Sequence, residues 1–214
     1  MPGWHVAIVD EMGKEVPDGK IGNIVLKLPL PPGALPTLFH NDEGYRKSYL
    51  THFPGYYETS DAGYIDEDGY VYIMSRVDDI INVAGHRLST GGMEEVVSGH
   101  PDIAECAVIG VADQLKGDVP VGLVVLKAGH DRTPDELTKE LVLRVRESIG
   151  AVAAFKRVLV VKRLPKTRSG KILRNVMRAI ADGREYTAPA TIEDTAVLDE
   201  IQQAFHPEMT LQTG

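Results

Sequence analysis

Hydrophobic and polar positions change their spacing about a third of the way along the chain. Before residue 79, short apolar or alternating stretches are separated by Gly, Pro and Asp, a pattern typical of strands joined by turns. The pattern predicts strands over 4–9, 21–28, 56–58, 63–65 and 70–75, with a short helix over 45–52. Asp66-Glu67-Asp68-Gly69 indicates a hairpin turn before the last of these strands.

After residue 79, helical spacing alternates with continuous apolar runs, which indicates helices mixed with buried strands. Thr133 followed by Pro134, Asp135 and Glu136 is a helix start, because it combines an N-cap, a proline in the first turn and acidic residues there. We expect helices over 92–98, 133–148, 170–181 and 197–205, and strands over 104–111, 119–126 and 155–161.

These elements predict a mixed α/β (α+β) chain with two domains and a tail. Residues 1–78 form a β-rich block that would bury little surface alone, so we interpret it as the end of a larger, truncated N-terminal domain. Residues 79–185 form a small mixed α/β domain. Residues 186–214 are a weakly patterned C-terminal tail.

Composition limits the class of protein. The 214 residues are 43% hydrophobic and 25% charged, and no apolar run approaches the ~20 residues of a membrane span. The first residues contain Asp10 and Glu11 and no basic start, unlike a secretory signal. Cys106 is the single cysteine, which excludes an internal disulfide framework. We expect a cytoplasmic protein, or one of the mitochondrial matrix in a eukaryote, that does not bind membranes.

The positive charge is concentrated in one segment. The net charge is −8, yet seven basic residues and no acidic residue lie between positions 162 and 178. This segment indicates a local anion site, whereas nucleic-acid binding would need a wider basic face and is not expected. The seven are Lys162, Arg163, Lys166, Arg168, Lys171, Arg174 and Arg178.

The Gly170-Lys171 pair in this segment is not a phosphate-binding P-loop. That motif needs a glycine where Pro165 stands and a Ser or Thr where Ile172 stands. Two readings remain: a solvated basic turn, or a turn that presents one lysine at the start of a helix.

Three motifs read in order resemble a known family. They are YETSD at 57–61, SRVDDIINVAGHR at 75–87 and LPKTRSGK at 164–171. They resemble the C-terminal motifs of the adenylate-forming superfamily, which includes acyl-CoA synthetases, luciferases and peptide-synthetase adenylation domains. Residues 54–87 are most similar to the short-chain branch, the propionyl- and acetyl-CoA synthetases.

The resemblance implies that ATP and a carboxylate form an acyl-adenylate and pyrophosphate, and that coenzyme A then displaces AMP. Asp61 would accept hydrogen bonds from the ribose hydroxyls, which suits a two-oxygen acceptor. Arg76 would bind the same ribose or the nearby phosphate. Lys171 would be the catalytic cation of adenylation, which offsets the repulsion between the two anions.

The resemblance also assigns the second half-reaction. Asp78 matches the hinge about which the C-terminal domain rotates between the two steps. Ala84 and Gly85 would line the pantetheine tunnel, and Arg87 would contact phosphates of ATP or coenzyme A. Arg146 would contact coenzyme A, or is simply a solvated helix residue. Mg²⁺ would accompany ATP; His100 falls where some relatives hold a backbone-bound cation, but no metal ligand is assigned.

Two departures from the family pattern qualify this expectation. Ser60 replaces the glycine that usually precedes the ribose aspartate, and the upstream phosphate loop, adenine segment and acyl pocket are not in this sequence. We expect the C-terminal part of an AMP-forming propionate- or acetate-CoA ligase, inactive as this fragment alone, with the missing N-terminal half as a candidate partner. The alternative is a catalytically incompetent nucleotide- or partner-binding module from a truncated gene.

Overall fold

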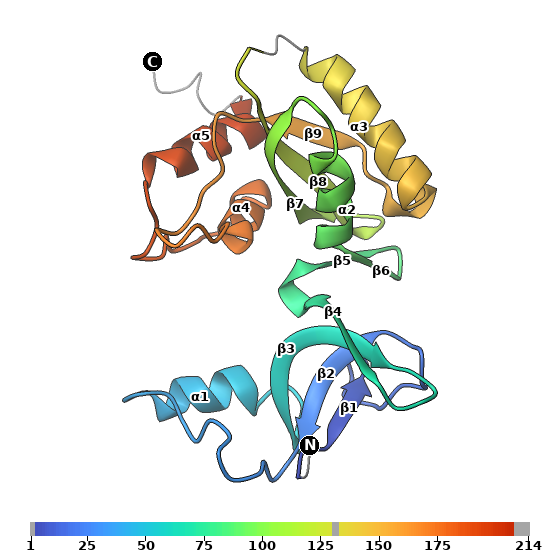
Figure 1. Cartoon of the computed structure of the whole chain (residues 1–214). Coiled ribbons are helices and arrows are strands. Elements are labelled where there is room, and N and C mark those ends of the chain that lie inside the picture. Colours follow the sequence, from blue (N-terminus) through green and yellow to red (C-terminus); the bar gives the residue numbers. More distant parts are fainter. Residues whose placement is uncertain (1–2, 130–132, 208–214) are drawn as a thin grey trace. The chain divides into compact units, whose positions relative to one another are not determined.

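The chain divides into two compact units, Met1–Asp78 and Asp79–Gly214. This division comes from a computed structural model, which describes residues 3–129 and 133–207. Figure 1 traces both units along the sequence. The fold is the expected mixture of helices and strands, with one sheet in each unit.

The first unit is an antiparallel sheet of four strands in the order β1-β2-β3-β4. Val9, Val25 and Phe53 form its small buried core. The strands are β1 (Val6–Val9), β2 (Gly22–Lys27), β3 (Tyr56–Ile65) and β4 (Val71–Arg76), and a helix, α1 (Asp42–Tyr49), precedes β3.

Two expectations for this unit are wrong in detail. The two short strands expected at 56–58 and 63–65 are one strand, β3, because the residues between them stay in the ladder around an irregularity. The expected helix at 45–52 begins at Asp42 instead. Its start is fixed by Asn41, whose side chain accepts a hydrogen bond from the backbone N–H of Gly44.

The second unit is a five-stranded sheet flanked by helices (Figure 1). The strand order is β6-β5-β8-β7, and β9 runs parallel to β8. The elements are β5 (Ile80–Val83), β6 (His86–Ser89), α2 (Thr90–Ser98), β7 (Ile103–Asp113), β8 (Gly117–Leu126), α3 (Pro134–Ser148), β9 (Arg157–Val160), α4 (Arg174–Ala181) and α5 (Ala196–Phe205), with short 3₁₀ turns η1 (Val77–Asp79) and η2 (Ala151–Ala153).

Helices cover both faces of this sheet. Leu123 of β8 points into a core shared with α4 and α5, whereas its neighbour Val124 points into a core shared with α2 and α3. Side chains alternate across a strand, so β7 and β8 must be apolar on both faces. This explains why 104–111 and 119–126 read as continuous apolar runs.

Three features of the second unit differ from the sequence pattern. The hairpin formed by β5 and β6 was not expected, and the helix expected from residue 170 begins at Arg174. The weakly patterned tail is part of the core, where Ile201 is fully buried beside α4. In the described residues, we find no helix with the length and apolar character needed to cross a membrane.

Candidate functional site

Asp61 and Arg76 lie side by side in the first unit. They are directly paired across β3 and β4, and Nη1 of Arg76 lies 3.9 Å from Oδ1 of Asp61. Their side chains are 34% and 50% exposed. A loose, half-exposed pair of this kind leaves carboxylate oxygens accessible to the hydroxyl groups of a ligand.

The residues before Asp61 form a β-bulge that fixes the position of the Asp61 backbone. The β2–β3 register shifts so that Ile24 faces Asp61 while Val25 faces Glu58. The Thr59 hydroxyl donates to the Ile24 carbonyl at 2.7 Å and accepts from the Asp61 N–H at 3.1 Å. Ser60 has a φ of +62°, a conformation that favours glycine. The serine therefore occupies the same kind of backbone position that the family pattern fills with glycine.

Ala84 and Gly85 form the two-residue turn of the β5–β6 hairpin. Both have positive φ, +49° and +87°, as a type I′ turn requires. The side chain of Asn82 accepts from the Gly85 N–H at 3.1 Å. A Cβ added to Gly85 would meet no atom within 4 Å. Within this unit, glycine is therefore favoured by the backbone conformation and not by packing.

Arg87 and Arg146 lie on different elements. Arg87 is in β6 opposite Asn82, beside the Ala84-Gly85 turn. Arg146 is exposed on the last turn of α3 and shares the rim of an apolar pocket of about 220 Å³ with Lys156. Phe155 and Val145 line the same pocket. An apolar pocket with two cations at its edge suits a ring that carries phosphate.

Lys171 lies directly after a tight turn. Lys166 bridges Ile172, and the Thr167 N–H donates to the Lys171 carbonyl at 2.9 Å, so the segment is a small hairpin. Gly170 has a φ of +83°, and the Thr167 hydroxyl accepts from the Lys171 N–H at 3.1 Å. Lys171 is exposed and lies on the outgoing arm of this loop, three residues before α4, not at a helix start as expected.

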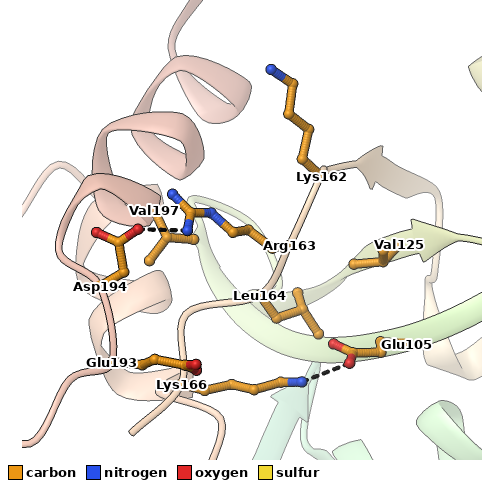
Figure 2. Close-up of a pocket in the computed structure, with 9 residues that line it drawn as sticks. All are labelled: Glu105, Val125, Lys162, Arg163, Leu164, Lys166, Glu193, Asp194 and Val197. Carbon is orange, nitrogen blue, oxygen red and sulfur yellow. Dashed lines mark hydrogen bonds and ion pairs between the residues drawn. The ribbon is translucent and has the colours of Figure 1, made fainter. Parts of the chain in front are cut away.

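Ion pairs neutralise most of the basic segment. Four of its seven cations are paired with carboxylates from other parts of the second unit. Figure 2 shows two of these contacts, Arg163 to Asp194 and Lys166 to Glu105. The other two are Arg174 to Glu94 and Arg178 to Asp118.

The expected anion site is therefore much narrower than the sequence suggests. Among the described residues, Lys162, Arg168 and Lys171 are the members of the segment without an ion pair. In the four pairs above, the carboxylate lies 31 to 80 residues away from its cation in the sequence. Charge counting along the sequence cannot find such partners, because the fold alone brings them together.

Asp78 and His100, the expected hinge residue and the residue at the expected cation position, both lie outside the long helices and strands. Asp78 lies in η1 at the division between the two units, and its side chain is outside the described part of the structure. His100 is buried, with Nε2 3.0 Å from Glu140 and Nδ1 accepting from the Asp102 N–H. Nε2 of His100 thus joins the α2–β7 turn to α3, and Nδ1 makes a hydrogen bond within the turn.

Cys106 is predicted to react slowly. Burial and, secondarily, the charge of Glu94 raise the pKa of its thiol to about 11. The thiolate fraction at pH 8 is then about 100-fold smaller than for an ordinary cysteine. We expect iodoacetamide to label the native chain about 100-fold more slowly than the urea-unfolded chain at that pH; equal rates would contradict this environment.

The chemistry-bearing residues of the second unit lie on different faces of its sheet. Lys171 precedes α4, which covers one face, and Arg146 is on α3, which covers the other (Figure 1). The Ala84-Gly85 turn lies at the β5–β6 end of the sheet. Among the described residues, no hydrogen bond or ion pair joins these three groups. The geometry therefore does not gather them into one site within this unit.

Comparisons with known proteins agree with the sequence motifs. The family model of the AMP-binding enzyme C-terminal domain matches residues 92–171. A protein of Pseudomonas aeruginosa described as Uncharacterized protein PA3568 is 58% identical over 96% of this chain and 33% of its own length. Acyl-CoA synthetase short-chain family member B, mitochondrial, of Dictyostelium discoideum is 55% identical over 96% of this chain and 30% of its own length.

More distant relatives extend this agreement. The acetyl-coenzyme A synthetase of Pyrobaculum arsenaticum is 43% identical over 96% of this chain and 30% of its own length. The structure of the anthranilate CoA ligase AuaEII with anthranoyl-AMP matches with a TM-score of 0.66 and 31% identity, over 85% of this chain and 34% of that one. The chain thus spans about a third of the length of these relatives. Residues 92–171 thus match the AMP-binding enzyme C-terminal domain, and nearly the whole chain is similar to part of the short-chain acyl-CoA synthetases.

Proposed function

We propose that this chain is the part of an AMP-forming short-chain acyl-CoA synthetase that supplies the catalytic lysine and the coenzyme A contacts. In the complete enzyme, acetate or propionate and ATP would give an acyl-adenylate and pyrophosphate. The thiol of coenzyme A would then displace AMP to form the thioester. The similarity to acyl-CoA synthetases of this branch supports the reaction class.

The environment of Lys171 is the observation that carries this proposal. It is an exposed cation on a short hydrogen-bonded loop and has no ion pair in the described residues, whereas Lys166 before it and Arg174 after it are both paired with carboxylates. Adenylation brings a carboxylate against the α-phosphate, and negative charge grows on the phosphorus oxygens as the bond forms. A positioned ammonium stabilises that charge, whereas an ion-paired one would first have to lose its partner.

Asp61 and Arg76 would hold the nucleotide. The carboxylate of Asp61 has two acceptor oxygens and can take both ribose hydroxyls at once. Arg76, its cross-strand neighbour, would contact the same ribose or the adjacent phosphate. The rigid Thr59 bulge would keep this pair in place while ATP exchanges for AMP.

The second half-reaction would use the other groups. The side-chain-free Gly85 and the small Ala84 would leave room for the pantetheine arm, and Arg87 and Arg146 would contact phosphates of ATP or coenzyme A. Lys171 and Arg146 are on opposite faces of one sheet, so rotation about Asp78 would present them in turn. The position of Asp78 at the division between the units supports this hinge.

The proposal also includes the metal ion that accompanies ATP and the cellular compartment of the enzyme. Bound to the phosphates of ATP, Mg²⁺ would reduce their charge; the described residues contain no cluster of three His, Cys, Asp or Glu for holding it. We propose the cytoplasm or the mitochondrial matrix as the compartment.

The proposal is tested by supplying the remaining two thirds of a short-chain relative to this chain, in frame or in trans. We expect thioester formation from ATP, coenzyme A and either acetate or propionate, detected by loss of free thiol. Longer acids such as octanoate are expected to give little product. If the assembly binds ATP but forms neither acyl-AMP nor thioester, the alternative of a nucleotide-binding module without catalysis is favoured.

A further inference from the structure

The segment after α4 contacts the loop that carries Lys171. We call residues 189–194 the brace segment. Thr167 bridges Ile192, the Arg168 N–H donates to the Thr191 carbonyl at 2.9 Å, and the Glu193 N–H donates to the Lys166 carbonyl at 2.9 Å. The brace segment therefore lies along the incoming arm of the lysine loop, held by one isolated antiparallel bridge and two backbone hydrogen bonds.

The brace segment is itself fixed to the rest of the unit. The Ile192 side chain is buried in the core shared by α4 and α5. Arg163, just before the loop, contacts Asp194 at 2.6 Å and Glu200 of α5 at 2.9 Å. Arg163 belongs to the basic segment, whereas Asp194 and Glu200 belong to the part of the chain that was expected to be a tail.

A side-chain contact holds the loop from the opposite side. Lys166 Nζ lies 2.7 Å from the Glu105 carboxylate on β7, and this pair lies at the edge of a pocket of about 440 Å³. Figure 2 shows Lys166 reaching toward Glu105 while Glu193 and Asp194 line the other wall. The base of the loop is thus tied to the sheet through Glu105 and to the brace segment through backbone hydrogen bonds.

The loop has little else to hold it. Arg168, Ser169, Gly170 and Lys171 are all exposed, so no buried side chain anchors the turn. The hydrogen bonds within the loop fix its internal shape but not its position on the domain. The position of the turn must therefore come from the contacts at its base.

We propose that the brace segment and Glu105 position the lysine loop for acyl-adenylate formation. They would touch neither substrate, and they would act through Lys171. This inference depends on the proposed role of Lys171. A small displacement of a charge-stabilising group lowers the rate steeply, because its interaction with the transition state depends on distance and orientation.

A proline at position 193 tests the brace in the chain itself. Glu193→Pro removes the N–H that donates to Lys166, whereas the exposed Glu193→Ala control keeps it. The residue before the substituted position, Ile192, forms an antiparallel bridge with Thr167. Such a bridge is typical of an extended backbone, which is the conformation favoured before a proline. We expect the Arg168 amide to exchange hydrogen at least about 10-fold faster in the proline variant only, with the Leu123 amide unchanged.

Activity of the complete enzyme gives the second readout. Glu193→Pro is expected to lower kcat for adenylation about 10-fold or more, with little change in the KM for ATP or in thioester formation from supplied acyl-adenylate. Glu105→Gln, which keeps the side-chain shape, should lower the same step less. The Glu193→Ala control should match the parent in both steps.

The outcomes separate the two proposals. Unchanged Arg168 exchange in Glu193→Pro overturns the brace, whatever the enzyme does. Faster exchange with unchanged adenylation shows that the loop needs no positioning, which also overturns the inference. If the parent assembly makes no acyl-adenylate at all, the proposed function fails instead, and the exchange result still reports on the brace.

Discussion

Replacing Lys171 by alanine is expected to slow acyl-adenylate formation by the complete enzyme about 10²- to 10³-fold, or about 2.7–4 kcal/mol of transition-state stabilisation. The ammonium would counter the charge that grows as two anions combine. Arg168 is the other cation of the loop without an ion pair among the described residues, and it lies before the Gly170 turn. Exchange of labelled pyrophosphate into ATP, dependent on the carboxylate, measures this step directly.

Lys162→Ala is the matched control for this prediction. Lys162 is also exposed, belongs to the same basic segment and has no ion pair among the described residues. Both variants lose one positive charge, so a general electrostatic effect would slow both equally. We expect Lys162→Ala to retain the parent exchange rate within about twofold. Equal losses would mean that overall charge, and not the position of Lys171, matters.

Gly85→Leu is expected to give the opposite pattern. The side chain would enter the space proposed for the pantetheine arm and slow thioester formation by 10-fold or more, while pyrophosphate exchange continues. The change also strains the turn, because Gly85 has a φ of +87°, and such a conformation costs about 1–2 kcal/mol for a residue with a Cβ. The isolated chain should therefore unfold at a lower denaturant concentration.

Two further variants separate obstruction from strain. Asn adopts positive φ more readily than Leu, so Gly85→Asn adds a side chain with less strain. Ala84→Gly relieves strain in the same turn and adds nothing. If the tunnel assignment is right, Gly85→Asn still impairs thioester formation and Ala84→Gly does not. Normal thioester formation by Gly85→Asn, or slower pyrophosphate exchange in Gly85→Leu, would count against the assignment.

Local patterns in the sequence predicted the helices and strands that have clear signals. The α3 helix begins where Thr133 and Pro134 place it, and the Thr133 side chain accepts from the Glu136 N–H. The apolar runs of β7 and β8 correspond to strands buried on both faces. Asp66 accepts from the Asp68 and Tyr70 N–H groups, as expected for the turn before β4.

Other features depend on contacts between distant residues. The short β5–β6 hairpin has a two-residue turn with Ala84 where such turns favour Asn or Asp, so its turn signal was weak. The helix at 170–181 begins late because Thr167 and Gly170 form a tight turn and Leu173 donates to the Pro165 carbonyl. The expected tail is part of the core because its apolar residues pack against apolar residues of α4. Local sequence patterns cannot predict this packing, because it joins two separate helices.

The candidate site shows the same division. The sequence motifs point to Asp61, Gly85 and Lys171, and their roles stay predictions. The residues that set the local geometry were not found from sequence: Thr59 fixes the bulge before Asp61, and Glu105 pairs with Lys166 at the base of the lysine loop. Their signals are long-range contacts, and such contacts are visible only in the folded chain.

The most direct test of the account supplies purified acyl-adenylate and coenzyme A to the Lys171→Ala enzyme in a single turnover. The account assigns the lysine to adenylation alone, so the variant is expected to form thioester from supplied acyl-adenylate at close to the parent rate, although its own acyl-adenylate formation is slowed about 10²- to 10³-fold. Loss of thioester formation to the same extent as loss of adenylation would contradict the division of labour between the two faces of this domain.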